Sequence, residues 1–582
     1  MKHFRTAFLL LTTTMVTTLL LGGCTRGSID LPSTTPDLEH LGLSAGELSP
    51  AFEAKSTYYT ANVGFLGNSI NITPIPVNPG ATVTINGTPN DSGIVFLEEG
   101  VNTITITVTA EDGVTQKSYI LEVRRQPLIA FAQQAYIKAS NTESGDLFGY
   151  KVALSGDTLA VAAHYENSSA TGIDGDSSNN STPTSGAVYV FTRNGNSWNQ
   201  EAYLKASNTD AGDRFGYSLA LSGDTLAVGT EYEDSSATGI NADELDNNAP
   251  QSGAVYVFSR TGTTRTQEAY IKASNTGTGD RFGCDVALEG DTLAVGARYE
   301  DSLAINLGGG PANNDASNSG AVYLFTRTEN SWTEVAYIKS SNARSGDYFG
   351  TNISLSGDTL VAGAWCEDSI ANQSGAVYVF TYDGTSWIEE AMLKASNCDD
   401  SDFFGITVAL SGDTLAVGAT GESSGATGIG GNESYNYCGG SGAVYLFTRI
   451  ANTWTQTDYV KASNTDGGDF FGKSLALSGD TLVVGAEYED SNAIGIGGVG
   501  SNNASSGSGA VYLFTRSGGS WSQSAYIKAS NSEWNDRFGT SVAVEGETVV
   551  VGAYFEESGS TGIGGNQTDN SEPNSGAVYV FE

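Results

Sequence analysis

Short runs of apolar residues, bounded by Gly, Asn or Asp, fill most of this chain. Between residues 103 and 108 Thr alternates with Ile and Val, which is the pattern of a half-buried β-strand. Residues 158–163 form a second short run, which is predicted to be a strand as well. Such short runs, separated by Gly-Asp and Asn-Gly turns, predict an all-β protein.

One pattern recurs seven times between residues 136 and 582. Each copy holds an Asn- and Asp-rich loop, a Phe-Gly pair, a turn of Gly with an acidic residue, a variable loop and a Ser-Gly-Ala-Val-Tyr segment. Successive Phe-Gly pairs lie 67 residues apart, with one interval of 55 residues. A repeat of this length, built from short β-type runs, is typical of arrays of β units.

The first copy predicts four strands, at residues 149–155, 158–163, 186–192 and 198–206. Two hairpins make a four-stranded blade, and blades packed face to face around an axis make a propeller. The loops between blades and the loops between the second and third strands then lie on one face of the disc.

Closure of the ring follows from a strand count. The last copy ends at Glu582, before any fourth strand, whereas residues 131–139 (FAQQAYIKA) precede the first copy. This segment matches the fourth-strand pattern WNQEAYLKA, with Phe131 in the place of Trp198. We therefore predict a seven-bladed propeller at residues 126–582 whose N-terminal strand completes the last blade and leaves no free sheet edge at the seam.

A small β domain is predicted at residues 37–125, after a tether at residues 24–36. Its Asp112-Gly113 pair suits a hairpin turn, because positive φ costs little there. The expected strands include residues 69–74, 81–85, 103–110 and 118–123.

Two family resemblances cover these domains. The phrases LGLSAGELSPAF, YYTANV, ATVTING, GVNTITITVTAEDG and KSYILEV resemble the cadherin-like β-sandwich of bacterial surface proteins, which implies a spacer or adhesive module. The set FG…SGDTLAVGA…SGAVYVF, spread over about 450 residues, resembles the FG-GAP repeats of the integrin α-subunit propeller. Integrin-type blades often carry a calcium loop in the first hairpin. Here turns such as Gly156-Asp157 and Gly223-Asp224 leave no room for one.

The first 23 residues are predicted to be an export signal. Lys2 and Arg5 form a basic start, and an apolar, Thr-rich stretch follows. The segment Leu21-Gly22-Gly23-Cys24 resembles a bacterial lipobox, which implies that Cys24 becomes the lipid-modified first residue of the mature protein. The resemblance places the protein in a bacterial cell envelope, anchored in the membrane through lipid at the outer membrane or cell surface. An ordinary secretory signal is the alternative.

Acidic residues outnumber basic ones by 66 to 27, which gives a formal net charge of −39. This charge repels nucleic acid and anionic membrane surfaces, so we expect no nucleic-acid partner. Cations or basic partners are favoured, although solubility alone also explains the composition. An oxidising compartment leaves disulfide pairing open, with three connectivities, for the four remaining cysteines: Cys284, Cys366, Cys398 and Cys438.

Three charged positions are identical in all seven copies. An Asp precedes each Phe-Gly pair by two residues: Asp146, Asp213, Asp280, Asp347, Asp402, Asp469 and Asp536. A Glu follows each second strand: Glu166, Glu233, Glu300, Glu367, Glu422, Glu489 and Glu556. A Lys sits in each fourth strand, from Lys138 to Lys528. A ring of cation-binding or acid–base carboxylates is one interpretation. We favour the other, that these charges satisfy one another and the backbone where blades meet, because a single site must break a sevenfold pattern.

Candidate ligand-binding residues therefore lie where the copies differ. The variable loops include residues 171–186, 238–253, 305–320 and 561–576, and the fourth copy has only residues 370–373 there. Asp174 with Asp176, and Asp243 with Asp246, are spaced as oxygen ligands for a hard cation such as Ca²⁺, with a solvated loop as the alternative. Trp365 and Trp534 fit no repeat position and lie near loop ends on the same face.

The sequence favours a binding protein over an enzyme. Beyond the export signal it contains only two histidines, His40 and His164, and no Ser-His-Asp pattern or phosphate loop. We expect an adhesion or envelope-assembly protein whose propeller binds a protein or glycan partner. A carbohydrate-active enzyme is the alternative, since two carboxyl groups suffice for that chemistry. A structural envelope protein without a defined ligand is the third interpretation.

Overall fold

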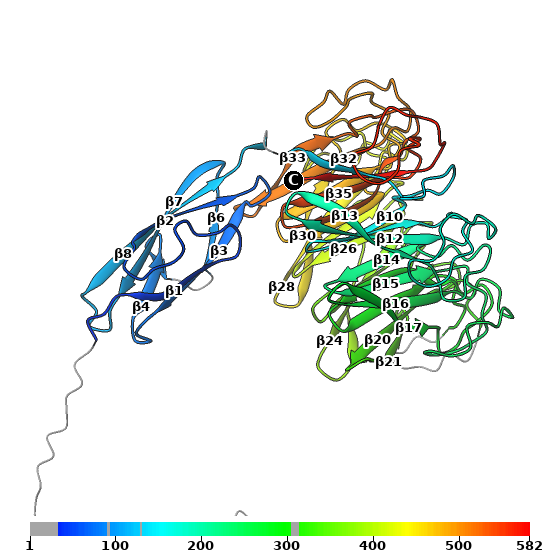
Figure 1. Cartoon of the computed structure of the whole chain (residues 1–582), viewed down its shortest axis with the longest axis horizontal. Helices are drawn as coiled ribbons and strands as arrows, with labels where there is room; N and C mark the ends of the chain where they lie inside the picture. The colour runs from blue at the N-terminus through cyan, green and yellow to red at the C-terminus, as the bar shows by residue number, and fades with distance from the viewer. Residues whose placement is uncertain (1–32, 90–92, 129–130, 304–313) are drawn as a thin grey trace, which may run out of the picture.

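The computed structural model describes residues 33–89, 93–128, 131–303 and 314–582 (Figure 1). The regular elements of these residues are all β-strands, which confirms the all-β prediction. They form a small sandwich followed by a larger, seven-sheeted domain. The export signal, Cys24, most of the tether and residues 304–313 of one variable loop lie outside the described residues.

The sandwich consists of two sheets. One has the order β1-β3-β6 and the other β2-β8-β7-β4-β5, in which β2 runs parallel to β8. Ile104, Ile106 and Val108 of β7 alternate with threonines and point into the core, as the sequence pattern predicts. The strand bounds are β1 (Leu38–Leu43), β2 (Tyr58–Val63), β3 (Ser69–Pro76), β4 (Thr82–Ile85), β5 (Thr88–Pro89), β6 (Ile94–Phe96), β7 (Gly100–Thr109) and β8 (Gln116–Arg125).

The larger domain contains seven four-stranded antiparallel sheets, one for each repeat, and these are the blades of a propeller. Blade 1 contains β10 (Lys151–Ser155), β11 (Thr158–Ala163), β12 (Ala187–Asn194) and β13 (Ser197–Leu204), and blade 2 contains β14 (Ser218–Ser222), β15 (Thr225–Thr230), β16 (Ala254–Thr261) and β17 (Thr264–Ile271). Blade 3 contains β18 (Phe282–Glu289), β19 (Thr292–Ala297), β20 (Ala321–Thr328) and β21 (Ser331–Ile338). Blade 4 contains β22 (Ile353–Ser356), β23 (Thr359–Ala364), β24 (Ala376–Tyr382) and β25 (Trp387–Leu393). Blade 5 contains β26 (Phe404–Ser411), β27 (Thr414–Ala419), β28 (Ala443–Ile450) and β29 (Thr453–Val460). Blade 6 contains β30 (Ser474–Ser478), β31 (Thr481–Ala486), β32 (Ala510–Ser517) and β33 (Ser520–Ile527). Blade 7 contains β34 (Phe538–Glu545), β35 (Thr548–Ala553), β36 (Ala577–Phe581) and β9 (Gln133–Ile137).

The N-terminal strand β9 completes blade 7, as predicted. It runs antiparallel to β36, with Ile137 opposite Val578 and Tyr136 opposite Tyr579. Blades 1 and 7 also contact each other directly, because the Ser541 hydroxyl donates a hydrogen bond to the Gly149 carbonyl at 2.9 Å. The first and last blades are therefore neighbours in a continuous ring.

The Phe-Gly pair has a physical role in each blade. Phe148 is fully buried and packs edge-on against Tyr189 of the Ser-Gly-Ala-Val-Tyr segment, with ring centroids 5.3 Å apart. Gly149 has a φ of +90°, and a Cβ there would lie 2.5 Å from the Ala577 carbonyl oxygen of blade 7. The pair thus supplies a core ring and a close approach between blades, and in blade 1 the regular strand begins only after it, at Lys151.

The two faces of the propeller differ. The hairpin turns within blades form one face, which we call the turn face, and the loops form the opposite face, which we call the loop face. The sandwich rests on the turn face: the Gly64 amide donates to Glu547, and the Asn68 amide donates to the Arg516 carbonyl at 2.6 Å. Figure 1 shows the long loops on the side of the propeller away from the sandwich.

The four described cysteines form no disulfide with one another in the described part of the chain. Cys284 and Cys366 are buried, and Cys398 and Cys438 are partly buried. Burial raises the pKa of the Cys284 thiol to about 12, so this side chain stays protonated and acts as a small apolar residue.

Candidate functional site

The sevenfold charged residues form a buried network beneath the loop face. In blade 1 the Lys205 ammonium donates to Glu166 at 2.9 Å and to the Ser185 hydroxyl at 2.7 Å. Asn141, from the loop that enters the blade, donates to the same Glu166 at 3.2 Å. The equivalent ion pairs are Lys138–Glu556, Lys272–Glu233, Lys339–Glu300, Lys394–Glu367, Lys461–Glu422 and Lys528–Glu489. This geometry supports the structural interpretation of the Lys and Glu positions.

The Asp that all seven copies share satisfies the backbone, which is part of the structural interpretation. Asp146 accepts a hydrogen bond from the Glu143 amide at 3.2 Å, and this pattern of an Asp capping the amide three residues earlier recurs in the other blades. The Asp thus holds the loop between blades and does not pair directly with Lys. Burial, together with the nearby Glu233 carboxylate, raises the pKa of Asp213 to about 8.

The candidate cation ligands accept hydrogen bonds from backbone amides. Asp174 accepts the Tyr203 amide at 2.9 Å, and Asp176 accepts the Ser178 amide at 3.0 Å. Asp243 and Asp246 accept the amides two residues further on, at 3.1 and 3.0 Å. Among the described residues no group of three or more His, Cys, Asp or Glu is arranged to hold a metal ion. The structure does not bring these aspartates together as one site.

The two tryptophans outside the repeat pattern lie apart. Trp365 is half-buried in blade 4, where it stacks on Tyr348 with ring centroids 5.5 Å apart. Trp534 lies in the loop that enters blade 7, and 69% of its surface is exposed. Both are on the loop face, as expected, but only Trp365 belongs to a larger aromatic cluster.

That cluster begins with the residue before each Phe-Gly pair. This residue varies among the copies, yet its φ is positive in every one, between 53° and 62°: Leu147, Arg214, Arg281, Tyr348, Phe403, Phe470 and Arg537. A left-handed backbone is unfavourable for large L-residues and persists only where the surroundings enforce it. Seven such residues therefore present variable side chains from a fixed backbone position.

Four of these seven side chains and four neighbouring ones form a continuous row of eight residues, which we call the arginine–aromatic arc. Each member is half-buried, and each contacts the next at centroid distances between 4.1 and 5.5 Å. From blade 1 to blade 5 the row reads Tyr165, Arg214, Tyr232, Arg281, Tyr299, Tyr348, Trp365 and Phe403.

The two arginines of the arc differ in their partners. Arg281 donates to the Tyr232 hydroxyl at 3.0 Å and lies 3.7 Å from Glu231, which is fully buried and also pairs with Arg298 at 2.8 Å. Arg214 lies between the rings of Tyr165 and Tyr232, at 5.0 and 4.1 Å. Within the part of the chain that the structure describes, its guanidinium has no hydrogen-bond acceptor and forms no ion pair, although its charge acts on the buried Glu231. Arg214 thus offers free donors at a half-buried position.

His164 lies beside the arc but has no catalytic setting. Its ring centroid is 3.8 Å from that of Tyr150, and Tyr165 and Tyr217 surround it. Burial, reinforced by the Arg214 charge, lowers its pKa to about 3, so the imidazole stays neutral at physiological pH. Aromatic rings enclose this histidine, and its Nδ1 has no hydrogen-bond partner among the described residues.

Our sequence reasoning missed the arc, although one signal was available. The residue before each Phe-Gly pair and the two residues before each conserved Glu are the positions where the copies differ beside invariant neighbours. The long variable loops drew attention away from these single positions.

Comparison with known proteins agrees with this architecture. Seven segments match the FG-GAP repeat, at residues 131–191, 198–258, 265–325, 332–380, 387–447, 454–514 and 521–581. Together they make up more than half of the chain, so this protein belongs to the FG-GAP repeat family. Residues 38–126 match the cadherin-like beta sandwich domain.

One curated relative is a "Putative membrane protein" of Evansella cellulosilytica, 42% identical over 105 residues. The match covers 17% of this chain and only 16% of that relative's length. Within the described residues no helix is long and apolar enough to cross a membrane.

Two solved structures are similar at a low level. The acylaminoacyl peptidase of Pyrococcus horikoshii is 10% identical, with a TM-score of 0.34, over 72% of this chain and 51% of that one. An acylaminoacyl peptidase in complex with Z-Gly-Gly-Phe-chloromethyl ketone is 11% identical, with a TM-score of 0.29, over 77% of this chain and 51% of that one. Both alignments are too weak to relate this chain to peptidase function.

Proposed function

We propose that this protein is a non-enzymatic binding or adhesion protein of the bacterial cell envelope. Its loop face binds a protein or glycan partner, and the arginine–aromatic arc receives an anionic group of that partner. The single observation that carries this proposal is Arg214, a half-buried guanidinium stacked between two tyrosines that makes no hydrogen bond or ion pair with an acidic side chain among the described residues.

The distribution of charge supports an anionic group at the arc. The seven network lysines of the propeller are each paired with a Glu, and the arginines of the turn face are paired with acidic residues as well. Arg214 forms no ion pair within the described residues, and neither does Arg537, which lies over Tyr488 on the same face, in a chain with a net charge of −39. Flat aromatic surfaces beside a guanidinium suit a sugar ring or a peptide that carries a carboxylate or sulfate.

The placement of the domains supports a role at a surface. We propose that Cys24 carries the lipid anchor, as the Leu-Gly-Gly-Cys segment implies. The sandwich rests on the turn face, so the loop face points away from the N-terminal domain (Figure 1). A partner can then reach the arc without meeting the sandwich.

Surface attachment of the purified full-length protein tests this function. We expect retention on surfaces coated with acidic glycans or acidic proteins, and weaker retention after removal of the 238–253 loop beside the arc. Incubation with a polysaccharide panel is the second arm. New reducing ends or unsaturated sugars would favour the carbohydrate-active alternative and contradict the proposal.

A further inference from the structure

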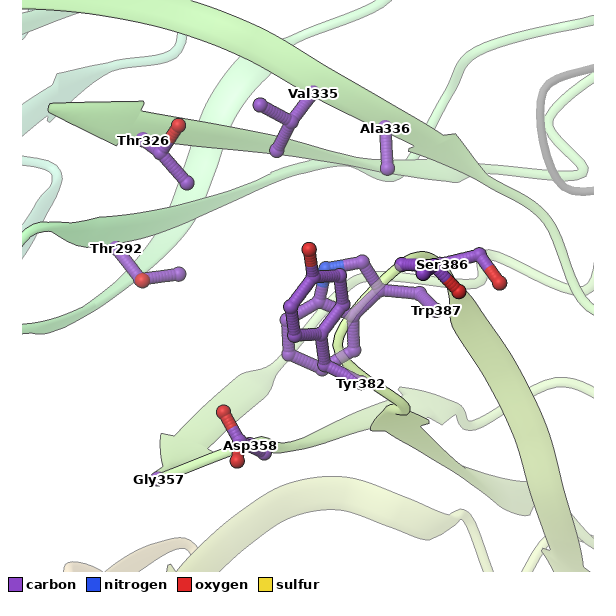
Figure 2. A pocket seen from close by; sticks show the side chains of 10 residues that line it. Thr292, Thr326, Val335, Ala336, Gly357, Asp358, Tyr382, Ser386 and Trp387 are labelled. Carbon is purple, nitrogen blue, oxygen red and sulfur yellow. The ribbon is translucent and has the colours of Figure 1, made fainter. Parts of the chain in front are cut away.

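A cavity of about 520 Å³ opens between blades 3 and 4 on the turn face (Figure 2). It lies far from the arc, on the opposite face of the propeller. Figure 2 shows Thr292 of blade 3 and Asp358 of blade 4 on two sides of the open space, with the rings of Tyr382 and Trp387 beside them. Val335 and Thr326 of blade 3 also line the cavity.

In five other blades an arginine of the chain itself fills the corresponding place. Arg327 of blade 3 lies 5.3 Å from the ring of Trp332 and pairs with Asp291 at 2.7 Å. It also donates to Glu268 at 3.1 Å and to Thr225 at 3.0 Å, both from the preceding blade. The corresponding residues of the other blades are Arg193, Arg260, Arg449 and Arg516.

Blade 4 departs from this arrangement at two positions. Tyr382 stands where the other blades have Arg, and Val335 of blade 3 stands where blade 2 has Glu268. The remaining partners are kept: Asp358 matches Asp291, and Thr292 matches Thr225. Within the described residues neither the Asp358 carboxylate nor the Thr292 hydroxyl has a side-chain partner. Two acceptors of a guanidinium are thus present without their donor.

In blade 7 the sandwich contacts the corresponding place. Phe65 packs against Phe131 with ring centroids 6.1 Å apart, and the Gly64 amide donates to Glu547, the counterpart of Asp358. A segment of another domain therefore reaches this place in blade 7.

We propose that the cavity between blades 3 and 4 binds an arginine side chain of a partner protein. The guanidinium donates to the Asp358 carboxylate and to the Thr292 hydroxyl, and its flat face lies against Tyr382. The aliphatic part of the side chain packs on Val335, which stands where blades 1, 2 and 4 have Glu201, Glu268 and Glu390. This inference does not depend on the loop-face proposal, because it uses residues of the opposite face.

Titration of the full-length protein with the peptide acetyl-Gly-Arg-Gly-amide tests the proposal. The control peptide carries citrulline, which has the same shape without the charge. We expect the arginine peptide to bind at least about tenfold more tightly than the citrulline peptide, since a charge-assisted pair is lost. Asp358→Asn should weaken binding by about tenfold as well. The matched control Asp413→Asn alters the same turn of blade 5, where Arg449 fills the site, and should leave binding unchanged.

A second variant gives the converse result. Tyr382→Arg restores the arrangement of the other blades, so its own guanidinium should occupy the cavity and abolish binding of the arginine peptide. Equal binding of the two peptides, no binding of the arginine peptide at millimolar concentration, or undiminished binding by Asp358→Asn would each overturn the proposal. Binding of neutral sugars that Tyr382→Arg abolishes, without binding of the arginine peptide, would assign the cavity to glycans instead.

Discussion

The ammonium of Lys205 lies 2.9 Å from a carboxylate oxygen of Glu166, and solvent reaches 1% or less of either side chain. This pair ties the fourth strand of blade 1 to the end of its second strand, and Asn141 ties the same carboxylate to the incoming loop. Because the arrangement recurs in every blade, seven such networks hold the strand ends and loops beneath the loop face in place. Removing one partner leaves the other buried and unpaired.

Lys205→Met should therefore destabilise the propeller by about 3–5 kcal/mol, measured as the change in unfolding free energy in urea. The matched control is Arg344→Met. Arg344 pairs with Asp368 at 3.4 Å, and more than half of each side chain is exposed. That control should cost less than about 1 kcal/mol. Equal effects of the two substitutions would show that the buried network is not a stabilising unit.

The raised pKa of Asp213 predicts a pH dependence of stability. In the unfolded chain this carboxyl has its ordinary pKa of roughly 4, whereas burial raises the pKa in the folded protein to about 8. Between these values the unfolded state has lost a proton that the folded state keeps. The contribution of the Asp213 carboxyl to the unfolding free energy is thus complete below about pH 4 and declines as the pH rises towards 8.

Asp213→Asn removes this titration while keeping an oxygen for the Asp210 amide. We expect its melting temperature to fall less than that of the wild type between pH 5 and pH 8.5. The control is Asp243→Asn, an exposed loop residue, which should keep the wild-type slope. If Asp213→Asn has the same slope as the wild type, the Asp213 carboxyl is ionised throughout this range.

Gly149 tests the seam between blades 1 and 7. Gly149→Ala places a Cβ about 2.5 Å from the Ala577 carbonyl oxygen, at a φ of +90°. Gly156→Ala also has a positive φ, of 55°, but its Cβ meets no atom within 4 Å. We expect Gly156→Ala to cost about 1 kcal/mol and Gly149→Ala at least about twice as much in unfolding free energy. Similar costs would contradict tight closure of the ring.

Much of the fold was predictable because the same pattern of strands and turns occurs in seven copies. The strand count alone placed residues 131–139 beside the C-terminal strand, and β9 pairs with β36 as expected. The second strand of blade 1, Thr158–Ala163, was also predicted with its observed bounds. In blade 1 the first strand was predicted to start two residues early, because Gly149 and Tyr150 lie in the close contact between blades rather than in the sheet.

The site was less predictable, for a local reason. Arg214 owes its position to a left-handed backbone conformation that packing between blades imposes, and no sequence pattern of a single strand or turn signals it. The aspartates of the long loops looked like cation ligands by spacing, yet Asp174 and Asp176 satisfy nearby amides instead. Trp365 was singled out correctly as a departure from the repeat, but its stacking on Tyr348 depends on the neighbouring loop that brings Tyr348 to it.

Arg214 gives the most direct test of the loop-face account. The measurement is the affinity of the full-length protein for immobilised dextran sulfate, with dextran of the same length as the neutral reference. We predict that the wild type binds the sulfated form selectively and that Arg214→Met weakens this binding by about tenfold. Arg260→Met, which removes a paired arginine of the turn face, should leave it unchanged. Full binding by Arg214→Met would contradict the assignment of the arc as an anion-binding site.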